Sequence, residues 1–250
     1  MGSETAFPKR LGPLVRLVEL LVILAAAAFI LMLLRRAVES GPPSRRTQCL
    51  NNIRNIGMAL FSYAMDNQNR LPTAYIADKE GRPIHSWRTS LLGYMDDFAL
   101  ASKYRWSEPW NGPHNSKLAE RPLGFLHCPD DSAPPTETSY MVVVGPRTAF
   151  PGSNSRSLEE IEKGDGTSNT ILSVEVRESG VNWMQPRDVK FEDAIRGINP
   201  RGVLGISSSH EGVVMVCFAD GHAVPISVDT SPQVLKQLLQ IDDGGPSKFP

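Results

Sequence analysis

The stretch Leu17–Leu34, LVELLVILAAAAFILMLL, decides how the chain is organised. Its only charged residue is Glu19. As an α-helix rising about 1.5 Å per residue, the stretch would be about 27 Å long, close to the roughly 30 Å of a bilayer hydrocarbon core. The sequence therefore predicts one membrane-spanning helix over residues 17–36.

A cleavable signal peptide is the alternative interpretation, because Lys9, Arg10 and Arg16 precede the apolar run. The run is longer than the usual apolar core of a signal peptide, and Arg35-Arg36 follow it in place of small residues. These features favour a retained anchor. Basic residues flank the run on both sides, and their count slightly favours a cytoplasmic location for the rest of the chain.

Glu19 is the unusual residue of the run, since an ionised carboxylate within hydrocarbon costs about 3 kcal/mol on insertion scales. The residue is therefore neutral, has a partner, or extends towards the headgroups. It lies only two residues inside the run, which favours a position near the headgroups beside Arg16.

A second helical pattern follows the anchor. Between Ser44 and Gln68, apolar residues recur mostly three or four positions apart, which predicts an amphipathic helix whose apolar face needs a partner surface. This set comprises Leu50, Ile53, Ile56, Leu60 and Ala64. Gly41-Pro42-Pro43 predicts a break between the two helices, so residues 37–43 are interpreted as a linker.

The remaining chain is rich in turns and short apolar runs, which predicts a small antiparallel β-sheet packed on the amphipathic helix. Asp220-Gly221 between two such runs predicts a hairpin. The fold class is therefore α+β with long loops, comprising a globular domain over residues 44–241 and a flexible tail over residues 242–250. The predicted strands are 141–144, 170–176, 213–218 and 223–228, and short helices are predicted at 91–94 and 232–241.

Composition narrows the function classes. The 250 residues include 26 basic and 27 acidic side chains, and this near-balance argues against nucleic acid as a partner. Apolar residues at 41% and charged residues at 21% exclude a wholly disordered chain and a polytopic membrane protein. The sequence carries no GxSxG, HExxH, Walker A, GxGxxG or CxxC motif. We therefore expect no enzymatic activity, no cofactor and no bound metal.

Several motifs carry a resemblance to a known family. The apolar run followed by CLNNIRNIGMALFSYAMDN (residues 49–67) resembles the N-terminal half of a type IV pilin-like or pseudopilin-like protein. Further blocks over residues 17–228 are similar to the planctomycete-type DUF1559 family of prepilin-like proteins. These blocks are SWRTSLLGYMD (86–96), EPWNGPHN (108–115), HCPDD (127–131), TSYMVVVGPRTAF (138–150), DGTSNTILSVEV (165–176) and SSHEGVVMVCFADGHAV (208–224).

The resemblance implies a single-pass protein of a bacterial inner membrane, with residues 1–16 in the cytoplasm and a pilin-like head outside it. Its partners would be other pilin-like subunits or a type II secretion or type IV pilus-like assembly. Glu19 would then pair with the free amine of a neighbouring subunit during assembly. The family pattern places a leader Gly at position 14, where this chain has Leu14, and Gly12 lies two residues early. Gly41-Pro42-Pro43 is a second departure, because assembling pilins often have one long continuous helix there.

The chain has three cysteines, and an extracytoplasmic head would permit one disulfide. We predict that Cys49 pairs with Cys128. Cys217 lies within an apolar strand, where an inward position normally holds a small hydrophobe, and is predicted to be a buried thiol.

Polar motifs give candidate sites, each with a structural alternative that we favour. His210 and Asp220 could form an acid–base or metal pair, although ten residues of extended strand span about 33 Å, so only a turn could join them. The loop residues Asp165, Gly166, Ser168 and Asn169 could hold Ca²⁺, but they also suit a turn that leads into a strand. The favoured interpretation for all of these residues, and for Gly221, is a turn or strand-start role.

Two further candidates are a cysteine nucleophile and a sugar-binding cleft. Cys128 could be activated by His114 or His210, but nothing local supports a thiolate. Aromatic side chains that could line a cleft suit core and loop packing better; they are Trp87, Trp106, Trp110 and Trp183. The sequence thus favours a non-enzymatic structural or interaction protein, and the alternative is an anchored domain that binds a ligand or hydrolyses a glycan or peptide.

Overall fold

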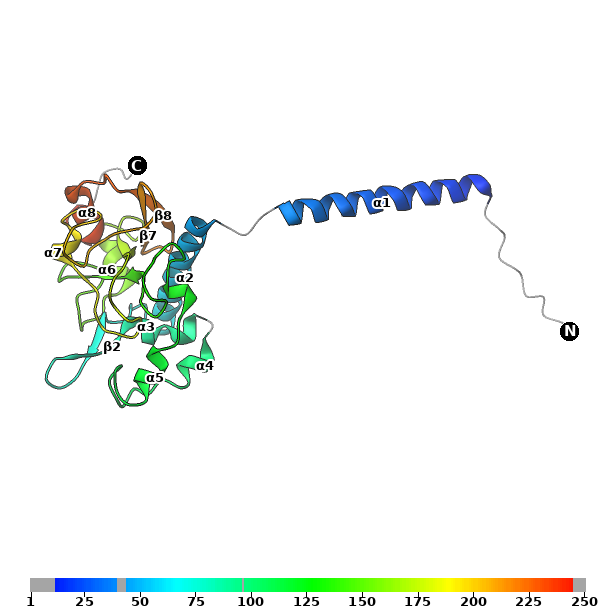
Figure 1. Ribbon diagram of the computed structural model, residues 1–250. Helices are drawn as coiled ribbons and strands as arrows, with labels where there is room; N and C mark the ends of the chain where they lie inside the picture. The colour runs from blue at the N-terminus through cyan, green and yellow to red at the C-terminus, as the bar shows by residue number, and fades with distance from the viewer. Residues whose placement is uncertain (1–11, 40–43, 96, 245–250) are drawn as a thin grey trace. The chain divides into compact units, whose positions relative to one another are not determined.

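The computed structural model describes residues 12–39, 44–95 and 97–244 (Figure 1). The chain divides into two compact units, an N-terminal unit that ends at Pro43 and a larger unit that begins at Ser44.

The N-terminal unit contains one helix, α1 (Pro13–Glu39). Its window Val15–Met32 has a mean hydropathy of 2.5 and no buried residue, so α1 is long and apolar enough to cross a membrane. Signal sequences near an N-terminus share this length and composition. The predicted helix is confirmed, but it continues three residues into the predicted linker. Gly41-Pro42-Pro43 and most of the predicted segment 1–16 lie outside the described residues.

The larger unit begins with α2 (Arg45–Asp66), which confirms the predicted amphipathic helix. Ser44 caps it, since its Oγ accepts a hydrogen bond from the Thr47 backbone N–H at 3.2 Å. The helix ends where Gln68 and Asn69 adopt φ values of 56° and 60°. Its buried face is formed by Cys49, Ile53, Ile56, Gly57, Ala59, Leu60 and Ala64.

The main sheet has four antiparallel strands in the order β3-β5-β7-β8. They are β3 (Tyr140–Met141), β5 (Ile171–Glu175), β7 (Val213–Phe218) and β8 (Ala223–Ser227). β7 and β8 form the predicted hairpin, in which Gly221 has φ 88°. This conformation suits the Gly of an Asp-Gly turn.

The two faces of the sheet are covered by different helices (Figure 1). Met215 and Cys217 on β7 pack into the cluster that contains the buried face of α2. Val214 and Val216 point the other way, into the cluster that contains α8 (Pro232–Leu239). This alternation is the two-residue period of a β-strand, so β7 is buried on both faces.

The predicted strand 141–144 is wrong as a single element. β3 pairs with β5, whereas β4 (Val143–Val144) pairs in parallel with β6 (Val189–Lys190). The ladder is interrupted at Val142, because its N–H donates to the Asp188 carboxylate at 3.1 Å. The larger unit, which begins at Ser44 and is called the head below, therefore contains a small parallel ladder in addition to the predicted antiparallel sheet.

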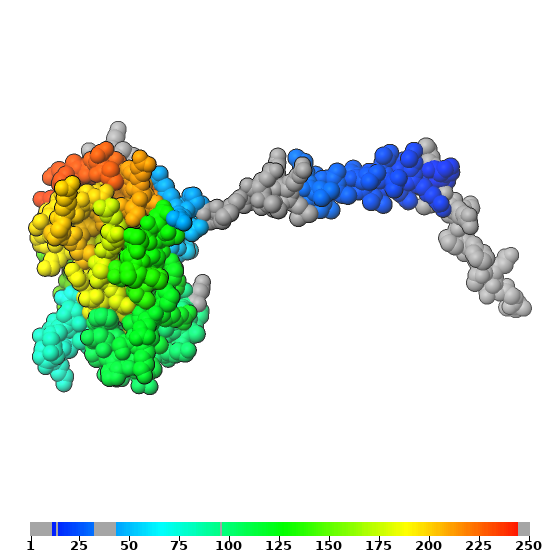
Figure 2. Space-filling view, in the orientation of Figure 1, coloured from blue at the N-terminus to red at the C-terminus, as the bar shows by residue number. Residues whose placement is uncertain are grey.

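A third ladder was not predicted from the sequence. It is the antiparallel pair β1 (Tyr75–Ala77) and β2 (Pro83–Ser86), which stands out from the surface of the larger unit, cyan in Figure 2. The short helices are α3 (Trp87–Ser90), η1 (Leu92–Tyr94), α4 (Phe98–Ala101), α5 (Asn115–Ala119), η2 (Gly124–Leu126), α6 (Leu158–Lys163) and α7 (Phe191–Ala194). η1 and α8 confirm the two short helices predicted.

More of the C-terminal segment contacts the head than the sequence predicts. Asp242 forms an ion pair with Arg147 at 2.7 Å. The Asp165 carboxylate accepts hydrogen bonds from the backbone N–H groups of Asp243 and Gly244. The predicted flexible tail is therefore held as far as Gly244, and residues 245–250 lie outside the described residues.

The close packing of α2 on the sheet gives a first prediction. A Cβ added at Gly57 would lie 2.3 Å from Cys217 Sγ, so we expect Gly57→Ala to lower the free energy of unfolding by about 1–3 kcal/mol despite the better helix propensity of Ala. Urea denaturation of the full-length protein in detergent, followed by tryptophan fluorescence, measures this change. Gly93→Ala is the control, since no atom lies within 4 Å of its added Cβ. A Gly57→Ala protein as stable as the wild type would contradict this packing.

Candidate functional site

The most distinctive polar cluster surrounds a disulfide. Cys49 on α2 is bonded to Cys128, which follows η2, and the two Cα atoms are 5.2 Å apart. This is the pair that the sequence analysis favours, and Cys217 is a buried free thiol. Both bonded cysteines are buried. The alternative that makes Cys128 a nucleophile is contradicted, because its sulfur is bonded to Cys49.

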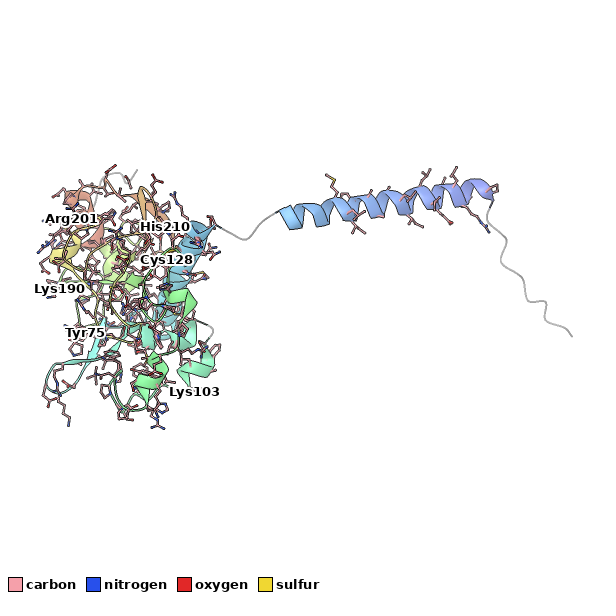
Figure 3. The ribbon with its side chains drawn as sticks, in the orientation of Figure 1. Tyr75, Lys103, Cys128, Lys190, Arg201 and His210 are labelled. Atoms are coloured by element: carbon pink, nitrogen blue, oxygen red, sulfur yellow. A yellow bond between two sulfur atoms is a disulfide. The ribbon has the colours of Figure 1, made fainter. Side chains whose placement is uncertain are left out.

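His210 lies against this disulfide; His210 and Cys128 are both labelled in Figure 3. The loop before β7 carries the histidine, and its side chain is 3% exposed. Its Nδ1 is 3.0 Å from Asp130 Oδ2. Its Nε2 is 3.4 Å from Cys128 Sγ and 3.5 Å from Glu175 Oε1. A carboxylate therefore lies on each side of the imidazole.

Glu175 ends β5 with its side chain only 1% exposed. Its Oε2 accepts a hydrogen bond from the Met215 backbone N–H at 3.1 Å. Burial raises the pKa of Glu175 to about 7, and burial also lowers the pKa of His210. Because the Asp130 carboxylate accepts, a neutral His210 ring carries its hydrogen on Nδ1. The lone pair of Nε2 then faces Glu175 and the disulfide.

The raised pKa predicts a pH-dependent stability. The folded state holds the Glu175 proton up to about pH 7, whereas the unfolded chain loses it near 4.5. The resulting stabilisation is complete below about pH 4.5 and is lost as pH rises through about 7, by about 3 kcal/mol at most. Glu175→Gln cannot ionise, so we expect its stability relative to wild type to rise between about pH 5 and about pH 8.

Urea denaturation at several pH values measures this difference between the two proteins. Glu211→Gln, at an exposed position in the same region, is the matched control and should leave the pH dependence unchanged. If the free energy of unfolding varied with pH in the same way in wild type and Glu175→Gln, the Glu175 carboxyl would ionise in the folded head without a free-energy cost.

A second buried polar cluster joins α3 to the segment before β6. Arg88 is fully buried, and its Nη2 lies 2.5 Å from Asp188 Oδ1. Asp188 also accepts hydrogen bonds from Trp87 Nε1 at 3.0 Å and from the Val142 N–H. Arg88 further donates to the Tyr140 backbone carbonyl at 3.3 Å. The sequence does not indicate this pair, because Arg88 and Asp188 are far apart in the chain.

Comparison with known proteins finds a family that matches part of the chain. Residues 43–162 match the family described as "Protein of unknown function (DUF1559)". Over this span, which is just under half of the 250 residues, the chain is similar to the DUF1559 family. The matched DUF1559 segment contains α2, both disulfide cysteines and Arg88, whereas Glu175, Asp188 and His210 lie beyond it. No curated protein and no solved structure matches the chain.

Beyond the DUF1559 segment, the structure does not bring together His210 and Asp220, the candidate pair that the sequence does not favour. Asp220 Oδ1 instead lies 2.5 Å from Nδ1 of His222, on the exposed turn between β7 and β8. His210 has Asp130 and Glu175 as its neighbours. The favoured interpretation, a strand-start histidine and a turn aspartate, describes their positions.

The loop that the sequence offers as a candidate Ca²⁺ site has a different set of contacts. Both carboxylate oxygens of Asp165 accept backbone N–H groups from the C-terminal segment. Asn169 Nδ2 donates to the Asp165 carbonyl at 2.9 Å, and Gly166 has φ 90°. Ser168 is exposed in the same turn. These contacts show that the loop holds the backbone of residues 243–244.

The four tryptophans do not line one cleft. Trp87 and Trp183 are buried in the core. Trp106, which is 48% exposed, and Trp110 flank an open groove of about 490 Å³ beside β2. Glu19 lies on α1, in the N-terminal unit, and is exposed there.

Proposed function

We propose that this protein is a membrane-anchored, pilin-like structural or interaction protein whose head lies outside the cytoplasm. The observation that carries the proposal is the combination of an apolar window in α1, Val15–Met32, that has no buried residue, and a disulfide in the core of the head. An unburied helix of this hydropathy is stable in lipid rather than in water. Disulfides persist in oxidising compartments such as the bacterial periplasm.

The disulfide weighs against the cytoplasmic orientation that the basic residues slightly favour. Arginines and lysines occur on both sides of the apolar run, so their count separates the two orientations only weakly. A buried Cys49–Cys128 bond requires an oxidant during folding, which the bacterial cytoplasm keeps scarce. The bacterial inner membrane with an external head is the arrangement that satisfies both features.

An interaction role is supported by the outer face of α2. Met58, Phe61 and Met65 are spaced three or four residues apart, and they are 59%, 45% and 64% exposed. Exposed apolar side chains aligned on one helix face suit contact with another protein. Pilin-like subunits or a secretion-type assembly are the partners that the family resemblance suggests for this surface, with Glu19 as the assembly residue.

The proposed role is non-enzymatic. The acid–base pair of His210 and Glu175 is almost completely buried and contacts a disulfide, so it has the character of a structural cluster. The groove beside Trp106 supports a second candidate, an anchored domain that binds a ligand through an aromatic side chain.

Protease treatment of spheroplasts tests the location. We expect protease added outside to digest the head and to leave a membrane-embedded fragment that contains α1. Protection of the head until the membrane is permeabilised would overturn the orientation, and recovery of the full-length chain as a soluble protein without detergent would overturn the anchor.

Mass spectrometry of the N-terminus tests the pilin-like part. A mature N-terminus at Val15, produced by cleavage after Leu14, would support processing and assembly. An intact Met1 would favour the anchored ligand-binding domain. Where a filament is isolated, Glu19→Ala should abolish its assembly.

A further inference from the structure

The disulfide, Glu175 and His210 together bring four metal-binding side chains to one point. Cys49 Sγ, Cys128 Sγ, a Glu175 carboxylate oxygen and a His210 ring nitrogen all lie within 4.8 Å of one another, and all four residues are buried. Two thiolates, one imidazole and one carboxylate are ligands that Zn²⁺ takes in four-coordinate sites. The four residues therefore present a complete ligand set once the sulfurs are reduced.

The spacing of these atoms fits a tetrahedral ion. Zinc bond lengths of about 2.0–2.3 Å place neighbouring ligand atoms about 3.3–3.8 Å apart. His210 Nε2 is 3.4 Å from Cys128 Sγ and 3.5 Å from Glu175 Oε1. Those two distances already match the distances between zinc ligands. The main rearrangement required is therefore that the two bonded sulfurs move apart.

Neighbouring groups orient two of the ligands towards the centre. Asp130 Oδ2 accepts from His210 Nδ1 at 3.0 Å, which leaves Nε2 for a metal. The Met215 N–H donates to Glu175 Oε2 at 3.1 Å, which leaves Oε1. A carboxylate behind a ligating histidine is the usual outer contact of zinc sites, because it fixes the ring and raises its basicity.

We propose that reduction of the Cys49–Cys128 disulfide converts this cluster into a zinc site. A dithiol or phosphine reductant supplies two electrons that break the sulfur–sulfur bond, and each sulfur takes up one proton. The dithiol becomes a disulfide, or the phosphine takes an oxygen from water. Zn²⁺ then displaces the two thiol protons into solvent, together with the Glu175 carboxyl proton wherever that group is protonated, while His210 Nε2 and Glu175 Oε1 donate lone pairs to the ion.

The consequence is that α2 and the HCPDD segment are joined in either redox state. In the oxidised protein the link is covalent, and the sulfurs offer no thiolate to a metal. In the reduced protein the link is the ion, which also binds the end of β5 and the loop before β7. Zinc therefore binds only the reduced form.

Metal titration of the full-length protein in detergent tests the site. The protein is reduced with the phosphine TCEP, separated from it without oxygen, and titrated with Co²⁺ and then Zn²⁺. We expect one equivalent of Co²⁺ to produce thiolate-to-cobalt charge-transfer and tetrahedral d–d absorption, and Zn²⁺ to displace it. The untreated, oxidised protein should give neither band. Cys217→Ser should keep the full stoichiometry, since Cys217 lies outside the four-residue cluster.

Variants separate this site from binding by loose thiols. His210→Ala and Glu175→Gln should weaken Co²⁺ binding and alter the d–d absorption, whereas His222→Ala should not. Asp130 contacts the ligand His210 and not the ion. We therefore expect Asp130→Asn to weaken metal binding about 10–100-fold. An unfolded reduced chain that binds through cysteines alone would be insensitive to all of these substitutions.

Three results would overturn the proposal. They are the absence of Co²⁺ binding by the reduced protein, equal binding by the oxidised protein, and binding that His210→Ala leaves unchanged. Where reduction itself unfolds the head, one equivalent of Zn²⁺ should restore its near-ultraviolet circular dichroism, and failure to restore that signal would count equally against the site.

Discussion

Replacing Arg88 with methionine is expected to lower the free energy of unfolding of the head by about 3–5 kcal/mol. The substitution removes the cation that stabilises the Asp188 carboxylate, whose pKa burial already raises. The group must then either remain charged in the interior or take up a proton, and both cost free energy. Asp188 is 3% exposed, so water cannot replace the guanidinium. Its two remaining donors, Trp87 Nε1 and the Val142 N–H, are neutral and offset only part of the cost.

The loss should be larger than the ion pair alone suggests, because Arg88 satisfies several buried acceptors. It donates to the backbone carbonyls of Tyr140 and Gln185 and to Ser86 Oγ. Methionine fills a similar volume but donates to none of them. Each acceptor left unpaired costs about 1–3 kcal/mol when it is fully buried.

Urea denaturation followed by tryptophan fluorescence measures the effect on the head, because all four tryptophans lie there. Arg82→Met is the matched control, since Arg82 is 73% exposed and its pair with Asp78 contributes at most about 1 kcal/mol. The double variant Arg88→Met/Asp188→Leu should recover part of the loss, because no unpaired charge remains. A loss below about 1 kcal/mol for Arg88→Met would show that Asp188 does not carry a buried charge.

The elements that could be predicted from the sequence are those whose pattern is local. α1 follows from one uninterrupted apolar run, α2 from a helical repeat of apolar residues, and the β7–β8 hairpin from Asp220-Gly221 between two apolar runs. In each case the residues that specify the element are neighbours in the chain. The spacing of the apolar residues then distinguishes a helix from a strand, whichever surface the element packs against.

The elements that were missed depend on distant partners. Residues 141–144 read as one strand, yet Asp188 takes the Val142 N–H and divides the run between two ladders. The parallel pairing of β4 with β6 likewise joins segments separated by the main-sheet strand β5. No local pattern predicts such contacts, because they are determined by how the whole head packs.

The residues of the candidate site divide in the same way, into those that a local pattern indicates and those that depend on distant partners. Cys49 and Cys128 could be chosen because Cys217 occupies an apolar strand, where a buried thiol is expected. The histidine beside them was instead considered with Asp220, its near neighbour in sequence, whereas its contacts are Asp130 and Glu175. Residues 170–176 read as an apolar strand. This pattern does not reveal that Glu175, at the end of β5, points into the interior. A buried carboxylate is recognised only when the surrounding packing is known.

Removing the disulfide by the double substitution Cys49→Ala/Cys128→Ala is expected to cost about 2–5 kcal/mol of unfolding free energy. The bond joins residues 79 apart, and a loop of this length restricts the unfolded chain by about 4–5 kcal/mol in the chain-entropy model. Because the bond also keeps the unfolded head compact, the double variant should show a larger denaturant m-value than the wild type. The double substitution is preferable to a single one, which would leave a reactive partner thiol.

Cys217→Ala is the control for this experiment, since it removes a buried sulfur without breaking a covalent link and should leave the m-value unchanged. Reduction of the wild-type disulfide should reproduce the loss seen in the double variant. Added zinc should reverse that loss in the reduced wild type and have no effect on the double variant, because ligands bound only to the folded head stabilise it. Equal midpoints and equal m-values for wild type and double variant would mean that packing alone holds α2 to the HCPDD segment. The disulfide would then give no structural support to an external location of the head.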